Sequence, residues 1–90
     1  MGERTLEEIK TEILRRAGRV NPFERTKKED VEEVIARLTS LEPDTWGREW
    51  GKVGAKYEML AAEQEKKGLS KEAGDSYYLA YEYFRIGRYP

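Results

Sequence analysis

Residues 43–67 read PDTWGREWGKVGAKYEMLAAEQEKK, and residues 70–87 read SKEAGDSYYLAYEYFRIG. In both stretches the apolar residues recur alternately four and three positions apart, the spacing of one face of a helix. The first series is Trp46, Trp50, Val53, Tyr57 and Leu60, which the polar Gln64 continues in step, and the second is Ala73, Tyr77, Ala80 and Phe84. We therefore predict two helices, over about 44–67 and 70–87.

The residues around these two stretches indicate how the helices begin and how they are joined. Pro43 and Asp44 are typical of a helix start, and Ser70 can cap the second helix. Gly68 and Leu69 leave room only for a tight turn. The two helices are therefore expected to pack as a long antiparallel hairpin.

Two shorter helices are predicted before the hairpin, over about 6–17 and 27–39. Each begins with a capping box, a threonine followed three positions later by a glutamate. The two pairs are Thr5 with Glu8 and Thr26 with Glu29. We expect these helices to form a looser prelude to the hairpin.

Composition supports one all-α domain over residues 1–90. The chain is 39% charged and 38% hydrophobic, and no strand-length run alternates apolar with polar residues, so no sheet is predicted. The formal net charge of -1, with acids and bases interspersed, argues against nucleic-acid binding. The chain has no cysteine and no histidine, so we predict no metal site and no cofactor. Without a membrane-length apolar run or an apolar leader, a cytoplasmic protein is expected.

No catalytic residue is predicted. The nearest string to a hydrolase nucleophile motif, Gly74-Asp75-Ser76, lies inside a predicted helix, where a strained elbow cannot form. The acids have lysine or arginine three or four positions away, which favours ion pairing over general base catalysis.

Gly47, Gly51 and Gly54 share one stripe of the helix over 44–67, and each costs about 1 kcal/mol relative to alanine. Something must offset that cost. Close packing of another helix of the same chain is the favoured interpretation, and space for a ligand is the alternative.

Aromatic and aliphatic residues together cover almost the whole circumference of the helix over 70–87. We expect Tyr78, Leu79, Tyr83 and Tyr89 to leave an exposed aromatic surface that needs a partner, either a second copy or a larger domain. On this interpretation, Tyr83→Glu weakens self-association or docking and leaves the helical content intact.

Residues 44–90 resemble the N-terminal helical lid of a family of α/β-hydrolases. The resemblance rests on DTWGREW at 44–50, on AAEQEKKG at 61–68, and on KEAGDSYYLAYEYFRIGRYP at 71–90. The family includes FrsA-like esterases, 2,6-dihydroxypseudooxynicotine hydrolase and fungal polyketide-shortening hydrolases. In it, a tryptophan pair opens a long helix, and the following helix carries spaced alanines and tyrosines.

The resemblance implies a segment that caps a hydrolase domain, shapes its substrate pocket and supports a dimer. The implied reaction is hydrolysis of an ester or of a carbon–carbon bond. The nucleophile, acid and histidine of such an enzyme are missing from this chain, which is then either a fragment of a larger enzyme or a relative without activity. No catalytic residue is carried over.

A second resemblance is to the tetratricopeptide repeat. The spacing of its first helix is reproduced by Trp50, Val53, Gly54 and Tyr57. The spacing of its second helix is reproduced by Ala73, Tyr77 and Ala80. About seven more residues separate the halves than in that repeat, and only one such unit is found, whereas about three are needed to bury a core. A repeat-like hairpin that binds protein remains an alternative.

Two hypotheses follow. In the first, the chain is a hydrolase lid whose partner is the hydrolase core domain. In the second, it is a free-standing helical module that binds another protein or a second copy of itself. The candidate pocket or interface residues are Trp46, Trp50, Tyr57, Tyr77, Tyr81 and Tyr83. For each aromatic taken singly, core packing is the better interpretation.

Overall fold

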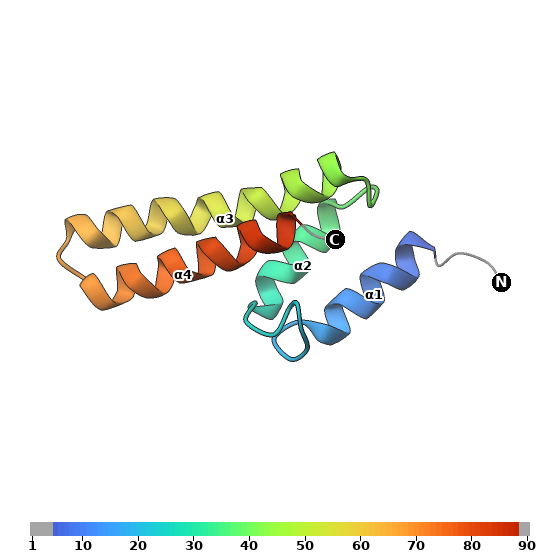
Figure 1. Cartoon of the computed structure of the whole chain (residues 1–90), viewed down its shortest axis with the longest axis horizontal. Coiled ribbons are helices and arrows are strands. Elements are labelled where there is room, and N and C mark those ends of the chain that lie inside the picture. The colour runs from blue at the N-terminus through green and yellow to red at the C-terminus, as the bar shows by residue number, and fades with distance from the viewer. Residues whose placement is uncertain (1–4, 89–90) are drawn as a thin grey trace.

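The computed structural model describes residues 5–88, which form four α-helices and no β-strand (Figure 1). The helices are α1 (Leu6–Arg16), α2 (Lys28–Arg37), α3 (Pro43–Lys66) and α4 (Ser70–Gly87). The prediction of four helices and no sheet is confirmed for these residues, and the helix bounds agree to within two residues.

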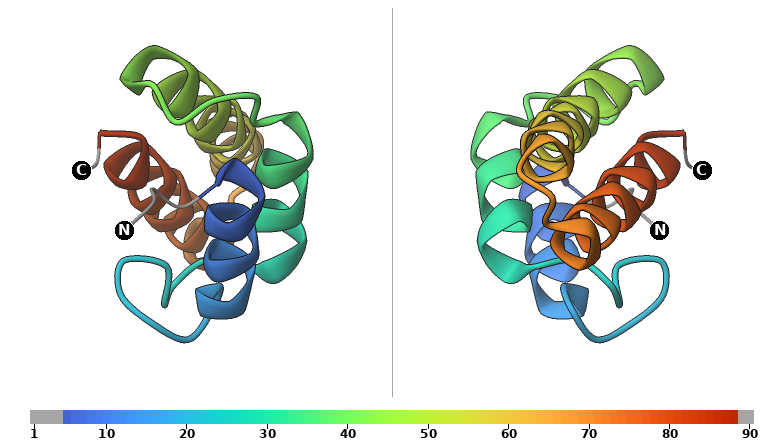
Figure 2. Two further views of the ribbon diagram at one scale, coloured as in Figure 1. Left: turned by 90° about the vertical axis from the view of Figure 1, so that its right-hand side faces the viewer. Right: turned by 90° about the vertical axis from the view of Figure 1, so that its left-hand side faces the viewer.

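Helices α3 and α4 pack along their length as the predicted antiparallel hairpin (Figure 1). Both α1 and α2 lie on one side of it, near the end at which the chain enters α3 (Figures 1 and 2). The end of the hairpin that carries the α3–α4 turn extends beyond them. One whole side of the hairpin is therefore free of the other two helices.

The turn between α3 and α4 depends on Gly68. Its φ of 76° lies in the left-handed region, which glycine adopts without a steric penalty. The amide of Gly68 donates to the carbonyl of Glu65, and the amide of Leu69 donates to that of Gln64. This is the Schellman arrangement, which satisfies the last carbonyls of α3 and reverses the chain at once.

The structure bears out one predicted helix cap and corrects two. Thr5 and Glu8 form the predicted capping box of α1. Thr26 does not cap α2, because its hydroxyl donates to the carbonyl of Phe23 and accepts from the amide of Gly18, which closes the loop before α2. Ser70 does not cap α4 because it is already the first helical residue, and Leu69 stands at the cap position.

Helix α2 is an integral part of the core, and the N-terminal pair is less loose than expected. The largest fully buried side chains come from α2, α3 and α4, and they are Val31, Val34, Leu38, Trp50, Val53, Tyr83 and Ile86. Helix α1 packs on α2 and contributes Ile13 and Ala17. No helix among the described residues is long and apolar enough to cross a membrane.

Candidate functional site

The structure divides the candidate aromatic residues between the core and the surface. Trp50, Tyr57 and Tyr83 are buried, whereas Tyr77 is 40% exposed and Tyr81 is 55% exposed. Trp46 is partly buried and donates from Nε1 to the carbonyl of Ile86 at 2.8 Å. This bond ties the start of α3 to the end of α4.

The buried aromatics form a continuous stack. The ring of Tyr83 lies 5.7 Å from that of Tyr57 and 6.1 Å from that of Trp50, with interplanar angles of 14° in both pairs. Phe23, from the loop before α2, extends the stack at 5.8 Å from Trp50. These rings are used in the interior of the domain, as the core-packing interpretation has it, and they are not free to line a pocket.

The expectation that Tyr83 lies on an exposed aromatic surface is wrong. Its side chain has no exposed area, because α2 packs over it and Asp30 of α2 accepts a hydrogen bond from its hydroxyl. Leu79 is also partly buried against the core, while Tyr78 is 44% exposed. Tyr89 lies outside the described residues. The change Tyr83→Glu would therefore place a charge in the core and unfold the domain.

The α3 glycines mark close packing within the chain. A Cβ added at Gly47 would lie 3.2 Å from the carbonyl oxygen of Gly87, and one at Gly54 would lie 3.0 Å from three atoms of the Phe84 ring. Gly51 borders the same ring at 4.0 Å. The intramolecular interpretation of the glycine stripe is thereby supported, since α4 occupies the space.

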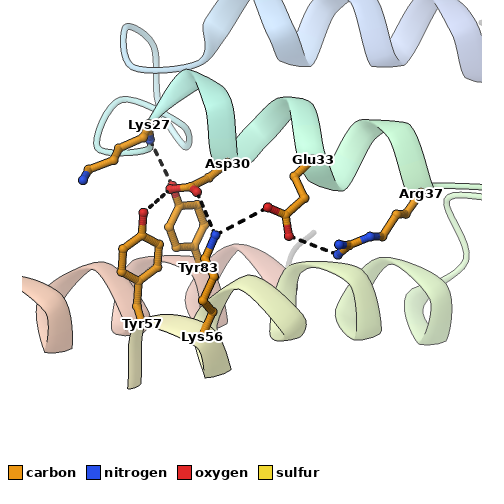
Figure 3. Close-up of polar contacts among 7 residues, drawn as sticks. All are labelled: Lys27, Asp30, Glu33, Arg37, Lys56, Tyr57 and Tyr83. Atoms are coloured by element: carbon orange, nitrogen blue, oxygen red, sulfur yellow. Dashed lines mark hydrogen bonds and ion pairs between the residues drawn. The ribbon is translucent and has the colours of Figure 1, made fainter. Parts of the chain in front are cut away.

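A buried polar cluster joins α2 to both helices of the hairpin (Figure 3). Asp30 is only 3% exposed, and its Oδ2 accepts hydrogen bonds from the hydroxyls of Tyr57 at 2.6 Å and Tyr83 at 2.7 Å. The backbone amide of Lys27 in turn donates to the Tyr83 hydroxyl at 3.0 Å. The cluster places a carboxylate at the centre of the helix contacts with its oxygen atoms hydrogen-bonded.

Lys56 supplies the charge that balances Asp30. Its Nζ lies 3.3 Å from Asp30 Oδ1 and 3.4 Å from Glu33 Oε1, and Arg37 pairs with the other oxygen of Glu33 at 3.1 Å. Burial lowers the pKa of Lys56, but the bonds to Asp30 and Glu33 outweigh it and raise that pKa overall. A lysine that stays charged keeps the buried carboxylate paired.

Both tyrosines of the cluster have pKa values raised above the ordinary value. Burial is the largest cause for Tyr57 and for Tyr83, and the negative charge of Asp30 adds to it. Their hydroxyls therefore remain protonated donors at neutral pH. Because Asp30 and both hydroxyls are enclosed, the cluster cannot reach a substrate, and its role is to fix α2 on the hairpin.

Asp30 was not among the candidate residues, although the sequence carries a signal for it. It lies four positions before Val34 and eight before Leu38, so it falls on the same face of α2 as these apolar residues. An acid on a buried stripe needs partners from another element. Those partners come from α3 and α4, more than twenty residues away, and no local pattern identifies them.

Several acids on the helices form ion pairs with a nearby lysine or arginine of the same helix, as predicted. Glu49 pairs with Lys52, and Glu82 pairs with Arg85, each three positions along its helix. On α1, Glu12 accepts from Arg15 and Arg16, whose hydrogen bonds lower its pKa to about 2. Within residues 5–88, no group of three or more acids is placed to hold a metal ion.

The surface that remains unused is the side of the hairpin away from α2, here called the outer face. Glu58 follows Lys56 by two positions and Tyr81 precedes Tyr83 by two, so each lies about 160° around its helix from a residue that binds Asp30. One stripe of the outer face belongs to α3 and one to α4, both with steps of four and three. The α3 stripe consists of Gly51, Ala55, Glu58, Ala62 and Glu65. The α4 stripe consists of Gly74, Tyr77, Tyr81, Phe84 and Arg88.

Most of the outer face is open to solvent. Only Gly51 and Phe84 of the two stripes are partly covered, because the Phe84 ring lies against Gly54 and borders Gly51. The hydroxyl of Tyr77 bonds Glu65 at 3.1 Å, which holds its ring across the seam between the helices. The outer face thus combines large rings on α4 with small residues on α3, and it holds the two exposed candidate tyrosines.

Comparison of the chain with protein-family models, with curated proteins and with solved structures finds no match. The fold and its surfaces therefore carry the functional argument.

Proposed function

We propose that this protein is a helical interaction module that joins two copies of the chain through the outer face of the α3–α4 hairpin. The observation that carries the proposal is the pair of outer-face stripes. Each keeps a four-three spacing over about four turns, and this is the spacing by which helices pack along a common seam. Of the two stripes, the chain's own packing uses Phe84, which lies against the core, and Gly51 beside it.

The burial pattern supports an interaction module over a substrate-binding lid. Trp50, Tyr57 and Tyr83 serve the interior, so the candidate aromatics that remain exposed are Tyr77 and Tyr81. Tyrosine is suited to protein interfaces, because its ring buries area while its hydroxyl tolerates water. The formal charge of -1 opposes association of two copies only weakly.

The experiment is the solution mass of the full 90-residue chain, measured by sedimentation equilibrium from about 1 to 200 μM. A mass that approaches twice 10.5 kDa supports the proposal. The variant Tyr77→Ala/Tyr81→Ala should raise the dissociation constant at least about tenfold. Tyr78→Ala is the matched control, because Tyr78 is equally exposed but contacts Arg25 on another side of α4.

A monomer at every concentration would overturn the proposal. It would favour the hydrolase-lid hypothesis, which rests on the resemblance of residues 44–90 and in which a hydrolase domain covers the outer face. In that case, Tyr77 and Tyr81 are the aromatics placed to reach a bound substrate.

A further inference from the structure

The loop between α1 and α2, residues 17–27, lies in a segment with a strong excess of positive charge. Residues 15–28 hold six lysines and arginines and one acid, Glu24, which gives this segment a net charge of +5. The rest of the sequence carries -6, so the whole chain shows only -1. The net charge of the chain therefore conceals a basic segment.

Most cations of this segment have no ion-pair partner among residues 5–88. Arg15 and Arg16 both pair with Glu12. Four others, here called the loop cations, are exposed and form no ion pair within those residues: Arg19, Arg25, Lys27 and Lys28. Nine of the remaining twelve lysines and arginines in residues 5–88 do form ion pairs, so the lack of partners is concentrated in this loop.

Contacts with tyrosine rings position two of the loop cations without neutralising them. Arg25 donates to the hydroxyl of Tyr78 and lies 5.7 Å from the centroid of its ring. Nζ of Lys27 lies 5.7 Å from the centroid of the Tyr57 ring. A cation–π contact orients a cation and leaves its charge uncompensated. Lys27 and Lys28 also stand at the start of α2, where the helix dipole disfavours cations, so helix stability does not explain them.

The fold holds the loop in place and displays it. Phe23 is buried, and its carbonyl accepts a hydrogen bond from the amide of Gly18 at 2.8 Å. Arg85 of α4 donates to the carbonyl of Pro22 at 3.3 Å. The loop protrudes from the end of the molecule at which α1 meets α2 (Figures 1 and 2). The loop cations are therefore presented together on a fixed, projecting frame.

We propose that this loop binds the surface of a membrane that contains anionic phospholipids. A projecting loop meets a flat surface before the rest of the chain does, and the negative potential of that surface attracts the loop cations. Val20, next to Arg19 in sequence and 42% exposed, supplies an apolar side chain for the boundary between headgroups and acyl chains. Binding of this kind needs no membrane-spanning helix. The loop is also separate from the outer face, so the inference does not depend on self-association.

A nucleic acid is the less suitable polyanion for this surface. Proteins bind single strands along grooves, with bases stacked on aromatic rings, and they read duplexes by placing a helix or a strand in a groove. The loop cations lie on a projecting turn instead. The ring nearest to them on the surface, that of Tyr78, is already in contact with Arg25.

Sedimentation with lipid vesicles tests the proposal on the full 90-residue chain. Vesicles of phosphatidylcholine with about 30% phosphatidylserine should bind the chain at least about tenfold more strongly than phosphatidylcholine alone, at about 0.1 M salt. Raising the salt to about 0.5 M should weaken binding to the anionic vesicles at least about fivefold, because the loop cations are exposed to solvent.

Two double variants remove the same charge from different places. Arg19→Gln/Lys28→Gln removes two loop cations and should lower the affinity for anionic vesicles at least about tenfold. Lys66→Gln/Lys67→Gln is the matched control, because these lysines are exposed, have no ion pair within residues 5–88 and lie at the far end of α3. It should lower the affinity less than about twofold. Val20→Ser should lower it about threefold at constant charge. Circular dichroism confirms that the helices are intact.

Three outcomes would overturn the proposal. The first is absent binding, or equal binding to anionic and neutral vesicles. The second is an equal loss of affinity in the two double variants, which would show that total charge and not the loop is responsible. The third is binding to a single-stranded oligonucleotide, measured by fluorescence anisotropy, without binding to anionic vesicles, which would identify the partner as a nucleic acid.

Discussion

The hydroxyl of Tyr83 in α4 donates a 2.7 Å hydrogen bond to the carboxylate of Asp30 in α2, across 53 positions of sequence. The same carboxylate oxygen accepts from Tyr57 of α3. One side chain of α2 therefore contacts both helices of the hairpin, and the position of α2 depends on it. Fixing α2 on one side also leaves the outer face on the other side open to a partner.

The Tyr83 hydroxyl can be removed without removing its ring. In Tyr83→Phe the aromatic stack remains, but Asp30 loses one donor and the amide of Lys27 loses its acceptor. We expect the free energy of unfolding to fall by about 1–3 kcal/mol, because buried polar groups are left unpaired. Urea denaturation in dilute solution measures this. Tyr81→Phe removes an exposed hydroxyl and should change stability by less than about 0.5 kcal/mol.

Alkaline pH should destabilise the domain through the same cluster. The pKa values of Tyr57 and Tyr83 are raised in the folded chain from an ordinary value of 10.0, mainly by burial. The folded state thus holds protons that the unfolded state releases at about pH 10. Their stabilising effect is complete below that pH and declines above it, by about 1.4 kcal/mol per pH unit for each tyrosine.

Urea midpoints between pH 8 and 11 test this dependence. In Tyr57→Phe the decline above pH 10 should be shallower than in the original chain, and Tyr83 and Lys56, whose pKa values are also raised, should supply what remains. An equally steep decline in that variant would show that the pH dependence arises elsewhere.

Sequence patterns alone located the helices and the hairpin, because helix-period spacing, capping residues and Gly68 are all local signals. They placed Tyr83 wrongly, since its burial depends on how α2 crosses the hairpin. They missed Asp30 for the same reason, as its partners belong to distant helices. Two helix caps were wrong because the loop and helix geometry left Thr26 and Ser70 in other roles. Which face of the hairpin stays open is set by tertiary packing, and no local pattern contains it.

Two glycines, one on each hairpin helix, should respond in opposite ways to alanine. A Cβ at Gly74 meets nothing within 4 Å, so Gly74→Ala should stabilise the domain by about 0.5–1 kcal/mol through helix propensity. A Cβ at Gly54 lies 3.0 Å from the Phe84 ring. Gly54→Ala should therefore lose more by overpacking than it gains by propensity, a net loss of about 1 kcal/mol. Thermal unfolding of both variants checks the sign, and a stabilised Gly54→Ala would show that Phe84 moves freely.

Removing one partner of the Glu82–Arg85 pair should cost more than removing both. The carboxylate of Glu82 is 4% exposed and lies 2.7 Å from Arg85, which also donates to the carbonyl of Pro22. Arg85→Met leaves that carboxylate buried without its cation, and we expect a loss of about 2 kcal/mol. In Arg85→Met/Glu82→Leu no buried charge remains, so most of the loss should be recovered. Urea denaturation of the single and double variants decides it. A double variant no more stable than Arg85→Met would mean that the bond from Arg85 to Pro22, which holds the loop against α4, is the contribution that matters.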